Sequence, residues 1–236
     1  MDDKYYEKYF YLEREHWWFK ARNLILETHI SSLLKNKNIK ILNVGAGTGY
    51  TSVMLSKFGD VRSIEYNKKC CEIVSNKTNL KIEQGDIRNI NYDSNTFDLV
   101  TAFDVLEHID NDEKAVQEIY RVTKKNGLII TSVPAFNFLW SDHDEINHHY
   151  RRYTKKSFNI LFQNLKLDKI YCTYFNFFLF PLICAVRIFS KIKKKKIIKS
   201  DFENYNPSSL DKILFKIFSS ETFFLKNNIN LPFGVS

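Results

Sequence analysis

The chain has 236 residues, of which 44% are hydrophobic and 26% are charged, so it can bury a substantial core and is not disordered by composition. Its formal net charge of +8 is uneven, because a group of lysines follows one apolar stretch, and the rest of the charge indicates no partner. The four cysteines lack CxxC and metal-finger spacings, which argues against a disulfide framework and a zinc ribbon.

The first 38 residues are predicted to form a helical cap or lid. Leu26, Ile30 and Leu34 recur at helical spacing, which predicts a helix ahead of the first strand. The N-terminus lacks the apolar core of a signal peptide, and a cysteine pattern without disulfides fits a reducing compartment. We therefore expect a cytoplasmic protein.

Residues 39–175 are predicted to form the core, a Rossmann-like, doubly wound α/β fold with a mostly parallel sheet. Short apolar runs alternate there with helical patterns, which is typical of βα units. The predicted strands are 39–44, 61–66, 80–84, 97–103, 128–133 and one near 167–175. The predicted helices are 51–58, 68–76, 112–125, which Gly127 ends, and 155–165.

The remaining residues, 176–236, are predicted to be an apolar and basic appendage with helices over 178–192 and 209–226. Between the fifth strand and the helix at 155, residues 135–153 are irregular, polar and aromatic. A connection of that length is typical of an active-site loop.

A glycine-rich turn follows the first predicted strand, with Gly45, Gly47 and Gly49 in GxGxG spacing. Glycine lets the backbone approach a ligand closely, because it has no side chain. Dehydrogenases that bind dinucleotides use GxGxxG, and Tyr50 occupies the third place that this pattern requires. The spacing therefore disfavours a dehydrogenase.

Two acidic residues follow the turn in register with the next two strands. Glu65 stands near the end of the second strand, where a carboxylate can accept hydrogen bonds from both hydroxyls of a ribose. After the third strand, Asp86 and the apolar Ile87 suit the amino group and the face of an adenine. The competing interpretation is that both acids are ordinary solvated residues at strand ends.

These elements, together with Phe97–Val100 and Val105–Ile109, resemble class I S-adenosylmethionine-dependent methyltransferases over about residues 39–134. His16–Asn23 (HWWFKARN), Leu139–Asp144 (LWSDHD) and His149–Thr154 (HYRRYT) resemble a prokaryotic subgroup often found in polysaccharide or lipid pathways. The resemblance implies the class I methyltransferase fold and S-adenosylmethionine as the cofactor.

The residue before Val44 departs from the family, which usually has Asp where this chain has Asn43. Asparagine keeps an acceptor oxygen and loses the charge. Either the cofactor binds more weakly, or another acid such as Asp104 faces its ammonium group. Arg22 is expected near the cofactor carboxylate, beside a lid that includes Trp18, although simple packing is the alternative for these aromatic residues.

The sequence ends at Ser236, where the family normally continues into its last strand. We expect either a truncated chain or a sheet that lacks this strand.

The sulfonium of the cofactor is an activated methyl donor, so the protein has to align an acceptor and remove its proton. Histidine titrates near the working pH, and we favour His143 as the base, with Asp144 as its orienting group or as an alternative base. His108 and His149 are further candidates, and each histidine has a purely structural alternative. A metal could instead be held by the group of His143, Asp144, His148 and His149, but the spacing of these residues matches no standard metal site. We therefore expect no metal.

Arg151 and Arg152, beside Tyr153, are candidates for binding a phosphate or carboxylate on the acceptor. A surface salt bridge is the competing interpretation.

Residues 174–189 are almost entirely apolar, but polar residues interrupt them and they are shorter than the ~20 residues that span a bilayer. With the basic residues that follow, segment 174–199 is predicted to lie at the inner face of a membrane. The alternatives are a cover for the sheet edge and a homodimer contact. The basic residues are Lys191, Lys193, Lys194, Lys195, Lys196 and Lys199.

We therefore predict a methyltransferase for a small-molecule, saccharide or lipid-linked acceptor, acting by base-assisted O-methylation. Nucleic-acid methylation rests on basic charge alone, and Phe103–Leu106 replaces the Asn-Pro-Pro-Tyr-like sequence expected of such enzymes. A scaffold or regulatory protein that binds the cofactor without catalysis is the other alternative.

Overall fold

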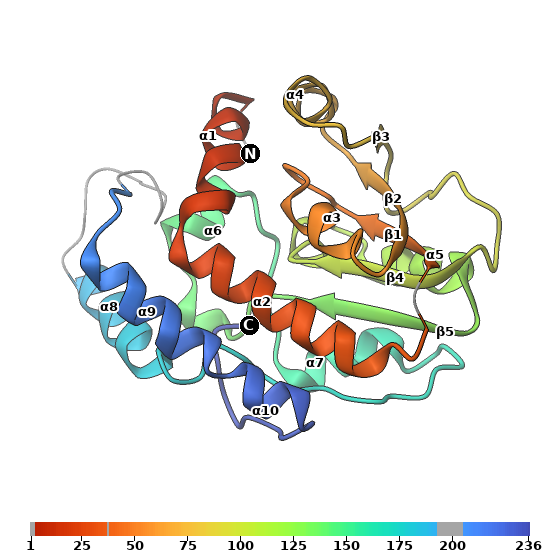
Figure 1. Cartoon of the computed structure of the whole chain (residues 1–236). Coiled ribbons are helices and arrows are strands. Elements are labelled where there is room, and N and C mark those ends of the chain that lie inside the picture. The colour runs from red at the N-terminus through yellow and green to blue at the C-terminus, as the bar shows by residue number, and fades with distance from the viewer. Residues whose placement is uncertain (1–2, 37, 193–204) are drawn as a thin grey trace.

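Five apolar segments form one parallel sheet. The computed structural model describes residues 3–36, 38–192 and 205–236 (Figure 1). The strands are β1 (Ile39–Val44), β2 (Gly59–Glu65), β3 (Ile82–Gln84), β4 (Phe97–Phe103) and β5 (Thr123–Ser132). They lie in the order β3-β2-β1-β4-β5, and every neighbouring pair is parallel. The order reverses between β1 and β4, which is where sheets of this kind open a crevice for ligands.

Helices cover both faces of the sheet because alternate residues of its central strands point to opposite sides. The flanking helices are α2 (Trp17–Leu33), α3 (Tyr50–Leu55), α4 (Lys68–Lys77), α5 (Asp112–Val122) and α7 (Lys155–Phe162). Leu42 and Val44 of β1 belong to the cluster that α5 and α7 close, whereas Ile41 packs in the cluster that includes α2 and α3. The sequence prediction of a Rossmann-like, doubly wound α/β fold is thereby confirmed.

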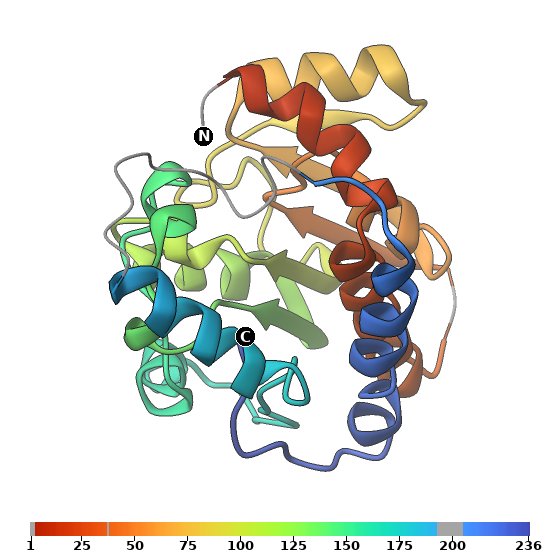
Figure 2. The ribbon, with the colours of Figure 1, turned by 90° about the vertical axis from the view of Figure 1, so that its left-hand side faces the viewer.

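Shorter elements and the C-terminal helices complete the chain. They are α1 (Asp3–Glu15), η1 (Leu106–His108), η2 (Asn137–Leu139), α6 (Asp142–Ile146), α8 (Phe180–Ile192), α9 (Ser209–Ser219) and α10 (Thr222–Lys226). Helices α9 and α10 pack along α2 (Figure 2), where Phe218 and Leu225 share a buried cluster with Ala21 and Ile25. Helices α9 and α10 of the appendage therefore cover α2 and lie away from β3.

His16 separates the first two helices. Its Nδ1 accepts a hydrogen bond from the backbone N–H of Trp18 at 3.1 Å, so His16 caps α2. Beyond this break α1 runs toward α3 and α4 (Figure 1). The predicted N-terminal cap is thus two helices, and the first of them extends over the glycine turn.

The boundary between α5 and β5 differs from the sequence prediction. The helix ends at Val122 and the strand begins at Thr123, so Gly127 lies inside β5 and does not end the helix. Thr123 pairs with Phe97 of β4, and this pairing replaces the last helical turn that the apolar pattern predicted.

The strand predicted over 167–175 is wrong. Residues 166–178 are irregular. The backbone of Phe175 pairs with the end of the chain: its N–H donates to Ser236 O, and its carbonyl accepts from Val235 N, both at 2.9 Å. Val235 O in turn accepts from Ala135 N at 2.7 Å. The end of the chain thus lies beside the residues that follow β5, and the described residues beyond β5 contain no further strand.

The helix predicted over 209–226 is divided between α9 and α10 by Glu221. This side chain is fully buried, and its carboxylate accepts the backbone N–H groups of Asn176, Phe177 and Phe178 at 2.6, 2.8 and 3.1 Å. A buried acid needs such donors, and here they come from the turn that precedes α8. Glu221 therefore fixes the start of α8 against α9.

No helix among the described residues is long and apolar enough to cross a membrane, and α8 has only 13 residues. Of the predicted lysine cluster, Lys193, Lys194, Lys195, Lys196 and Lys199 lie outside the described residues.

The turn between β1 and α3 provides a matched test of two glycines. Gly45 has φ +65°, and a Cβ there would lie 2.4 Å from Val105 Cγ2, whereas Gly47 has φ +53° and its nearest neighbour would be 3.9 Å away. We expect Gly47→Ala to lower the free energy of unfolding by about 1–2 kcal/mol through backbone strain. Gly45→Ala should lower it by about 2–5 kcal/mol, because overpacking against Val105 is added.

Urea titration of both variants measures these values. Val105→Ala in the Gly45→Ala background should restore part of the loss, and equal losses for the two glycine variants would contradict this account of the packing.

Candidate functional site

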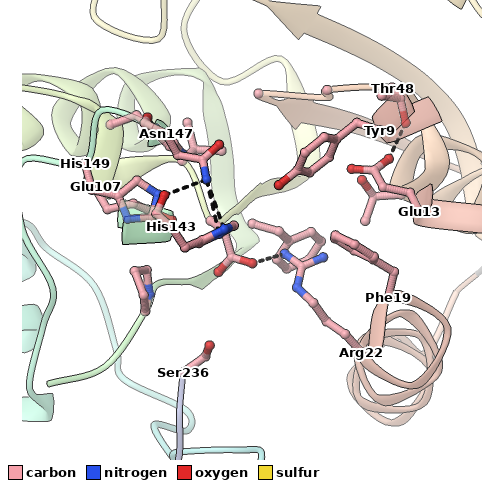
Figure 3. A pocket seen from close by; sticks show the side chains of 18 of the residues that line it. Tyr9, Glu13, Phe19, Arg22, Thr48, Glu107, His143, Asn147, His149 and Ser236 are labelled. Atoms are coloured by element: carbon pink, nitrogen blue, oxygen red, sulfur yellow. Dashed lines mark hydrogen bonds and ion pairs between the residues drawn. The ribbon is translucent and has the colours of Figure 1, made fainter. Parts of the chain in front are cut away.

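A cavity of about 920 Å³ opens at the carboxyl ends of the strands, at the reversal between β1 and β4. Its walls come from α1 and α2, from the loops after β1 to β4, from residues 134–152 and from α8. Figure 3 shows side chains from these distant segments pointing into one space. The predicted cofactor elements and the predicted active-site loop therefore share a single cavity.

The glycine turn and Glu65 form one unit in the cavity wall. Glu65 Oε2 accepts the backbone N–H of Gly47 at 3.0 Å, and Oε1 accepts that of Asn67 at 3.0 Å. Two backbone donors hold the carboxylate in place beside the turn, and its remaining lone pairs are available to a ligand. The sequence prediction brought together Gly45, Gly47, Gly49 and Glu65, and all but Gly49 line the cavity.

Gly49 stands behind the turn. It has φ +81°, and its Cα approaches Leu80 and Val74, so a side chain there would meet these residues and not a ligand. Gly49, which the sequence predicts as a contact of the cofactor, is therefore not among the residues that line the cavity.

Asp86 and Ile87 also line the cavity, after β3. Ile87 is 5% exposed, and the Asp86 carboxylate is held by the Arg88 guanidinium, whose Nη2 lies 2.8 Å from Oδ2. The hydrogen bond from Arg88 is the main cause that lowers the pKa of Asp86, so this residue remains an acceptor. An ionised acceptor beside an apolar wall suits an aminopurine edge and face.

Helix α1 closes over the glycine turn. Thr48 donates its hydroxyl hydrogen to Glu13, and Arg14 Nη2 donates to Thr48 O at 3.1 Å. Burial raises the pKa of Glu13 even though the hydrogen bond from Thr48 opposes the shift. Sequence reasoning missed both α1 residues because acidic and basic side chains on a predicted surface helix carry no signal of what they will contact.

Arg22 and Asp104 form an ion pair on the cavity wall, with Arg22 Nη2 2.5 Å from Asp104 Oδ2. Ser132 Oγ donates to Asp104 Oδ1 at 3.0 Å, and Trp18 lies beside the guanidinium, 5.7 Å from its central carbon. The predicted positions of Trp18, Arg22 and Asp104 at the cavity agree with the structure, which adds that the two charges pair with each other.

Asn43 does not reach the cavity. It is 1% exposed, its Nδ2 donates to Ser52 Oγ at 2.9 Å and its Oδ1 accepts from Thr101 Oγ1 at 3.0 Å. Both ends of the amide are used beneath the glycine turn. Asn43, which the sequence predicts as a contact of the cofactor, is thus placed beneath the cavity wall, and its polar groups tie β1 to α3 and β4.

Four residues gather at the far end of the cavity from the glycine turn. Glu107, His108, His143 and His149 all line it, and Figure 3 labels Glu107, His143 and His149. Burial and the neighbouring Asp104 raise the pKa of Glu107, which is 1% exposed. Burial, together with His149, lowers the pKa of His108 to about 3. The cavity therefore favours neutral imidazole at His108.

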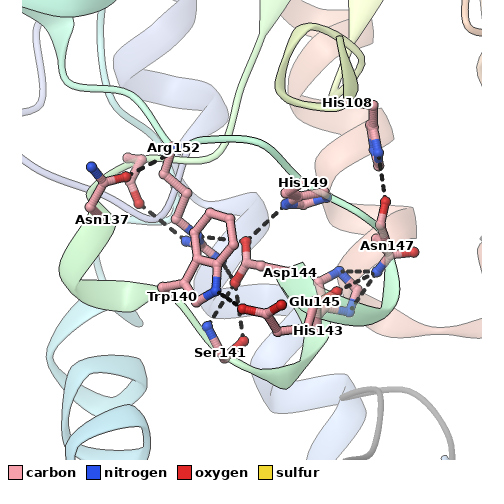
Figure 4. A network of polar contacts seen from close by, with 11 residues as sticks. His108, Asn137, Trp140, Ser141, His143, Asp144, Glu145, Asn147, His149 and Arg152 are labelled. Carbon is pink, nitrogen blue, oxygen red and sulfur yellow. Dashed lines mark hydrogen bonds and ion pairs between the residues drawn. The ribbon is translucent and has the colours of Figure 1, made fainter. Parts of the chain in front are cut away.

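Asp144 is buried behind this group and is the centre of a polar network (Figure 4). It accepts Arg152 Nε at 2.8 Å and Nη2 at 3.0 Å, and the backbone N–H of Ser141 at 2.8 Å. Its Oδ1 also lies 2.8 Å from His149 Nδ1. Burial alone would raise the pKa of Asp144, but the hydrogen bonds from His149 and Arg152 lower it.

Asp144 therefore orients His149, and the predicted pairing of Asp144 with His143 is corrected. The group beside His143 is Asn147, whose Nδ2 lies 3.2 Å from Nε2 and 3.3 Å from Nδ1. The sequence could not separate the two histidines, because both lie within five residues of Asp144.

Two of the three predicted acceptor-binding residues lie outside the cavity wall. Arg151 Nη1 lies 2.9 Å from Asp112 Oδ2, and the hydroxyl of buried Tyr153 donates to the same oxygen at 2.8 Å. Neither lines the cavity. Arg152 does line it, but its guanidinium is committed to Asp144 and to Ala135 O. In this structure all three residues make contacts within the protein, and their predicted role in binding an acceptor stays a prediction.

Residues 42–131 match a family model described as a methyltransferase domain. Among solved structures, a putative S-adenosyl-L-methionine-dependent methyltransferase from Methanococcus maripaludis aligns with a TM-score of 0.57 at 18% identity, covering 71% of this chain and 86% of that one. Residues 42–131 thus match the methyltransferase domain, and the chain shares its fold with this solved structure. A putative methyltransferase from Bacillus halodurans has the same fold, with a TM-score of 0.54 at 19% identity and coverage of 80% and 87%.

Sequence relatives of this methyltransferase domain include demethylmenaquinone methyltransferases from two staphylococci. The protein from Staphylococcus epidermidis is 27% identical over 128 residues, which are 48% of this chain and 53% of that protein. The protein from Staphylococcus aureus is 31% identical over 102 residues, 40% and 42% of the two chains. The chain thus spans about half the length of these relatives.

The Asp144 network allows a test of stability. Asp144→Ala leaves the buried Arg152 guanidinium without its carboxylate, and we expect the free energy of unfolding to fall by about 3–5 kcal/mol. Asp142→Ala, on the exposed side of α6, should lower it by less than about 1 kcal/mol. Urea denaturation followed by circular dichroism measures both, and similar losses would show that the ion pair is not the determinant.

Proposed function

We propose that the chain binds S-adenosylmethionine along the glycine turn and transfers its methyl group to an oxygen of an acceptor at the far end of the cavity. The observation that carries this proposal is the unit of Gly47 and Glu65, because it presents a fixed carboxylate beside an open backbone. Asp86 and Ile87 extend the same wall with an acceptor and an apolar face.

The residues present fit this cofactor. The methionine end of the molecule carries an ammonium and a carboxylate, and the cavity wall carries Asp104 and Arg22. These two charges pair with each other at 2.5 Å. The cofactor's ammonium group would instead pair with Asp104, and its carboxylate with Arg22. The pair thus supports Asp104 as the acid that serves in place of Asn43.

When bound, the cofactor supplies a methyl group already activated on a sulfonium. The chain's own residues have to orient the acceptor, exclude water and take up a proton. His143 lines the far end of the cavity and is held by Asn147, so we retain it as the base. Glu107, His108 and His149 surround the same space and are positioned to hold the acceptor oxygen.

An apolar, lipid-linked acceptor is supported by α8. Leu182, Ile183 and Val186 line the cavity, and Leu182 and Val186 are 58% and 57% exposed. One turn farther, Phe189 continues the exposed apolar face. We propose that this face lies at a membrane surface and guides the acceptor inward, with a homodimer contact through the same face as the alternative.

Cofactor binding is tested by calorimetry with S-adenosylmethionine. Glu65→Ala should lower the affinity at least about tenfold, because each hydrogen bond to a charged group contributes about 1.5–3 kcal/mol. Glu72→Ala changes an exposed acid on the neighbouring helix α4 and should bind like the unaltered chain. A folded, unaltered chain that does not bind the cofactor would remove the proposed function.

The acceptor class is tested with labelled cofactor and polyprenyl-linked saccharides, free sugars and RNA as acceptors. We expect label only in the lipid-linked product. Val186→Asp should raise KM for that acceptor about tenfold, because the apolar contact contributes about 1.5 kcal/mol or more, and should leave cofactor affinity unchanged.

Ile188→Asp is the matched control for this variant. Ile188 is 55% exposed on the same helix but does not line the cavity. An equal rise in KM for both variants, or methylation of RNA alone, would exclude the α8 route for the acceptor.

A further inference from the structure

We propose that Glu107, His108 and His149 form a binding site for a divalent transition-metal ion in the cavity wall. One ligand atom from each residue can be chosen such that all three lie within 4.8 Å of one another. The residues come from η1 and from the loop after α6, and the two imidazole rings stand nearly perpendicular with their centres 4.5 Å apart. Side chains that are distant in the sequence thus converge on a small volume.

Both imidazoles are fixed in the tautomer that a metal requires. His108 Nδ1 lies 2.9 Å from Asn147 O, and a carbonyl oxygen only accepts, so this nitrogen carries the hydrogen. His149 Nδ1 lies 2.8 Å from Asp144 Oδ1, and Asp144 already accepts from Arg152. In each ring the Nε2 lone pair is therefore left for a ligand.

The hydrogen bond between Asp144 and His149 is the kind of support that metal-binding histidines commonly have. A carboxylate or backbone carbonyl on the far nitrogen orients the ring and makes the near nitrogen more basic. Here one histidine has each type of partner, Asp144 for His149 and Asn147 O for His108. The supporting groups are buried, which keeps the rings from turning.

Glu107 supplies an observation that points to a cation. Its side chain is 1% exposed, and its Oε2 has no hydrogen-bond partner among the described residues. Buried carboxylate oxygens are normally paired with a donor or a metal ion. Because ligand atoms of the three residues lie within 4.8 Å of one another, an ion held by the two imidazoles would be within reach of the Glu107 carboxylate.

Two imidazoles and one carboxylate favour a transition metal such as Zn²⁺, Mn²⁺ or Fe²⁺ over a hard ion such as Ca²⁺. Three protein ligands leave coordination positions open, and these face the cavity that the three residues line. The sequence expectation of no metal concerned a different set of residues, which included Asp144 and His148. In the structure Asp144 supports His149 from behind, and His148 is exposed.

The ion would hold the acceptor's hydroxyl oxygen and lower its pKa, so that His143 can take its proton. This role rests on the proposed function. Binding of the ion does not, because its ligands belong to the chain alone.

The test uses the full chain, freed of metal with EDTA and titrated with Co²⁺ in the absence of S-adenosylmethionine. We expect one equivalent to bind, measured by calorimetry and by the visible absorption of Co²⁺ held by nitrogen and oxygen ligands. His149→Ala and Glu107→Gln should each weaken binding more than about a hundredfold, since loss of supporting groups alone costs up to that factor. His148→Ala, an exposed neighbour in the same loop, should bind like the unaltered chain.

Thermal unfolding of each variant shows whether it is folded. If His149→Ala does not fold, Glu107→Gln still tests the site, because it retains the shape of the side chain. Absence of stoichiometric Co²⁺ binding by the unaltered chain, or unchanged binding by the folded ligand variants, would overturn the proposal. Calorimetry with S-adenosylmethionine separates this result from the proposed function: a chain that binds Co²⁺ and not the cofactor keeps the metal site and loses the methyltransferase activity.

Discussion

The buried carboxylate of Asp144 holds together a part of the molecule that regular secondary structure does not. Residues 134–152 contain only η2 and the short α6, and their backbone pairs with few neighbours. A buried charge is tolerated only in a geometry that supplies its partners, and Arg152, His149 and the backbone of Ser141 supply them in one arrangement. That arrangement brings the loop histidines to the cavity, so the proposed chemistry depends on a buried ion pair of which only Arg152 borders the cavity.

The sheet contributes position and the loops contribute chemistry. Parallel strands end at one edge, so residues that follow β1 to β4 meet there although more than fifty positions separate the first from the last. The N-terminal helices then close the opening, with α1 bonded to Thr48 and α2 presenting Arg22. A cavity with polar groups at both ends and apolar α8 beside it follows from this arrangement.

Much of the fold could be predicted from the sequence because its signals are local. The apolar runs of β1 and β4 match their predicted bounds, since both strands are buried on two faces and every residue contributes to the pattern. Glu65 and Asp86 could be placed because a strand end fixes where the next side chain lies. The region after 166 was harder to predict, because Phe175 and Glu221 depend on partners 43 or more residues away.

Dependence on partners distant in the sequence also explains why some predicted site residues do not line the cavity. Three of them stand in recognisable motifs, yet their polar atoms bond to buried or half-buried neighbours: Asn43, Arg151 and Tyr153. A motif identifies which residues matter to the fold of a family, and only the contacts distinguish a residue that touches a ligand from one that supports its neighbour. Glu107 is the converse case, since its importance lies in a missing partner that the sequence does not reveal.

The bonds between α1 and Thr48 have a kinetic consequence. Glu13 and Arg14 hold the glycine turn from the side that faces the cavity, so a molecule lying against the turn is enclosed by the first helix. The exit of a cofactor bound as proposed would require these bonds to break and α1 to move away from α3 and α4. The opening of a single N-terminal helix would then limit the rate at which spent cofactor is exchanged.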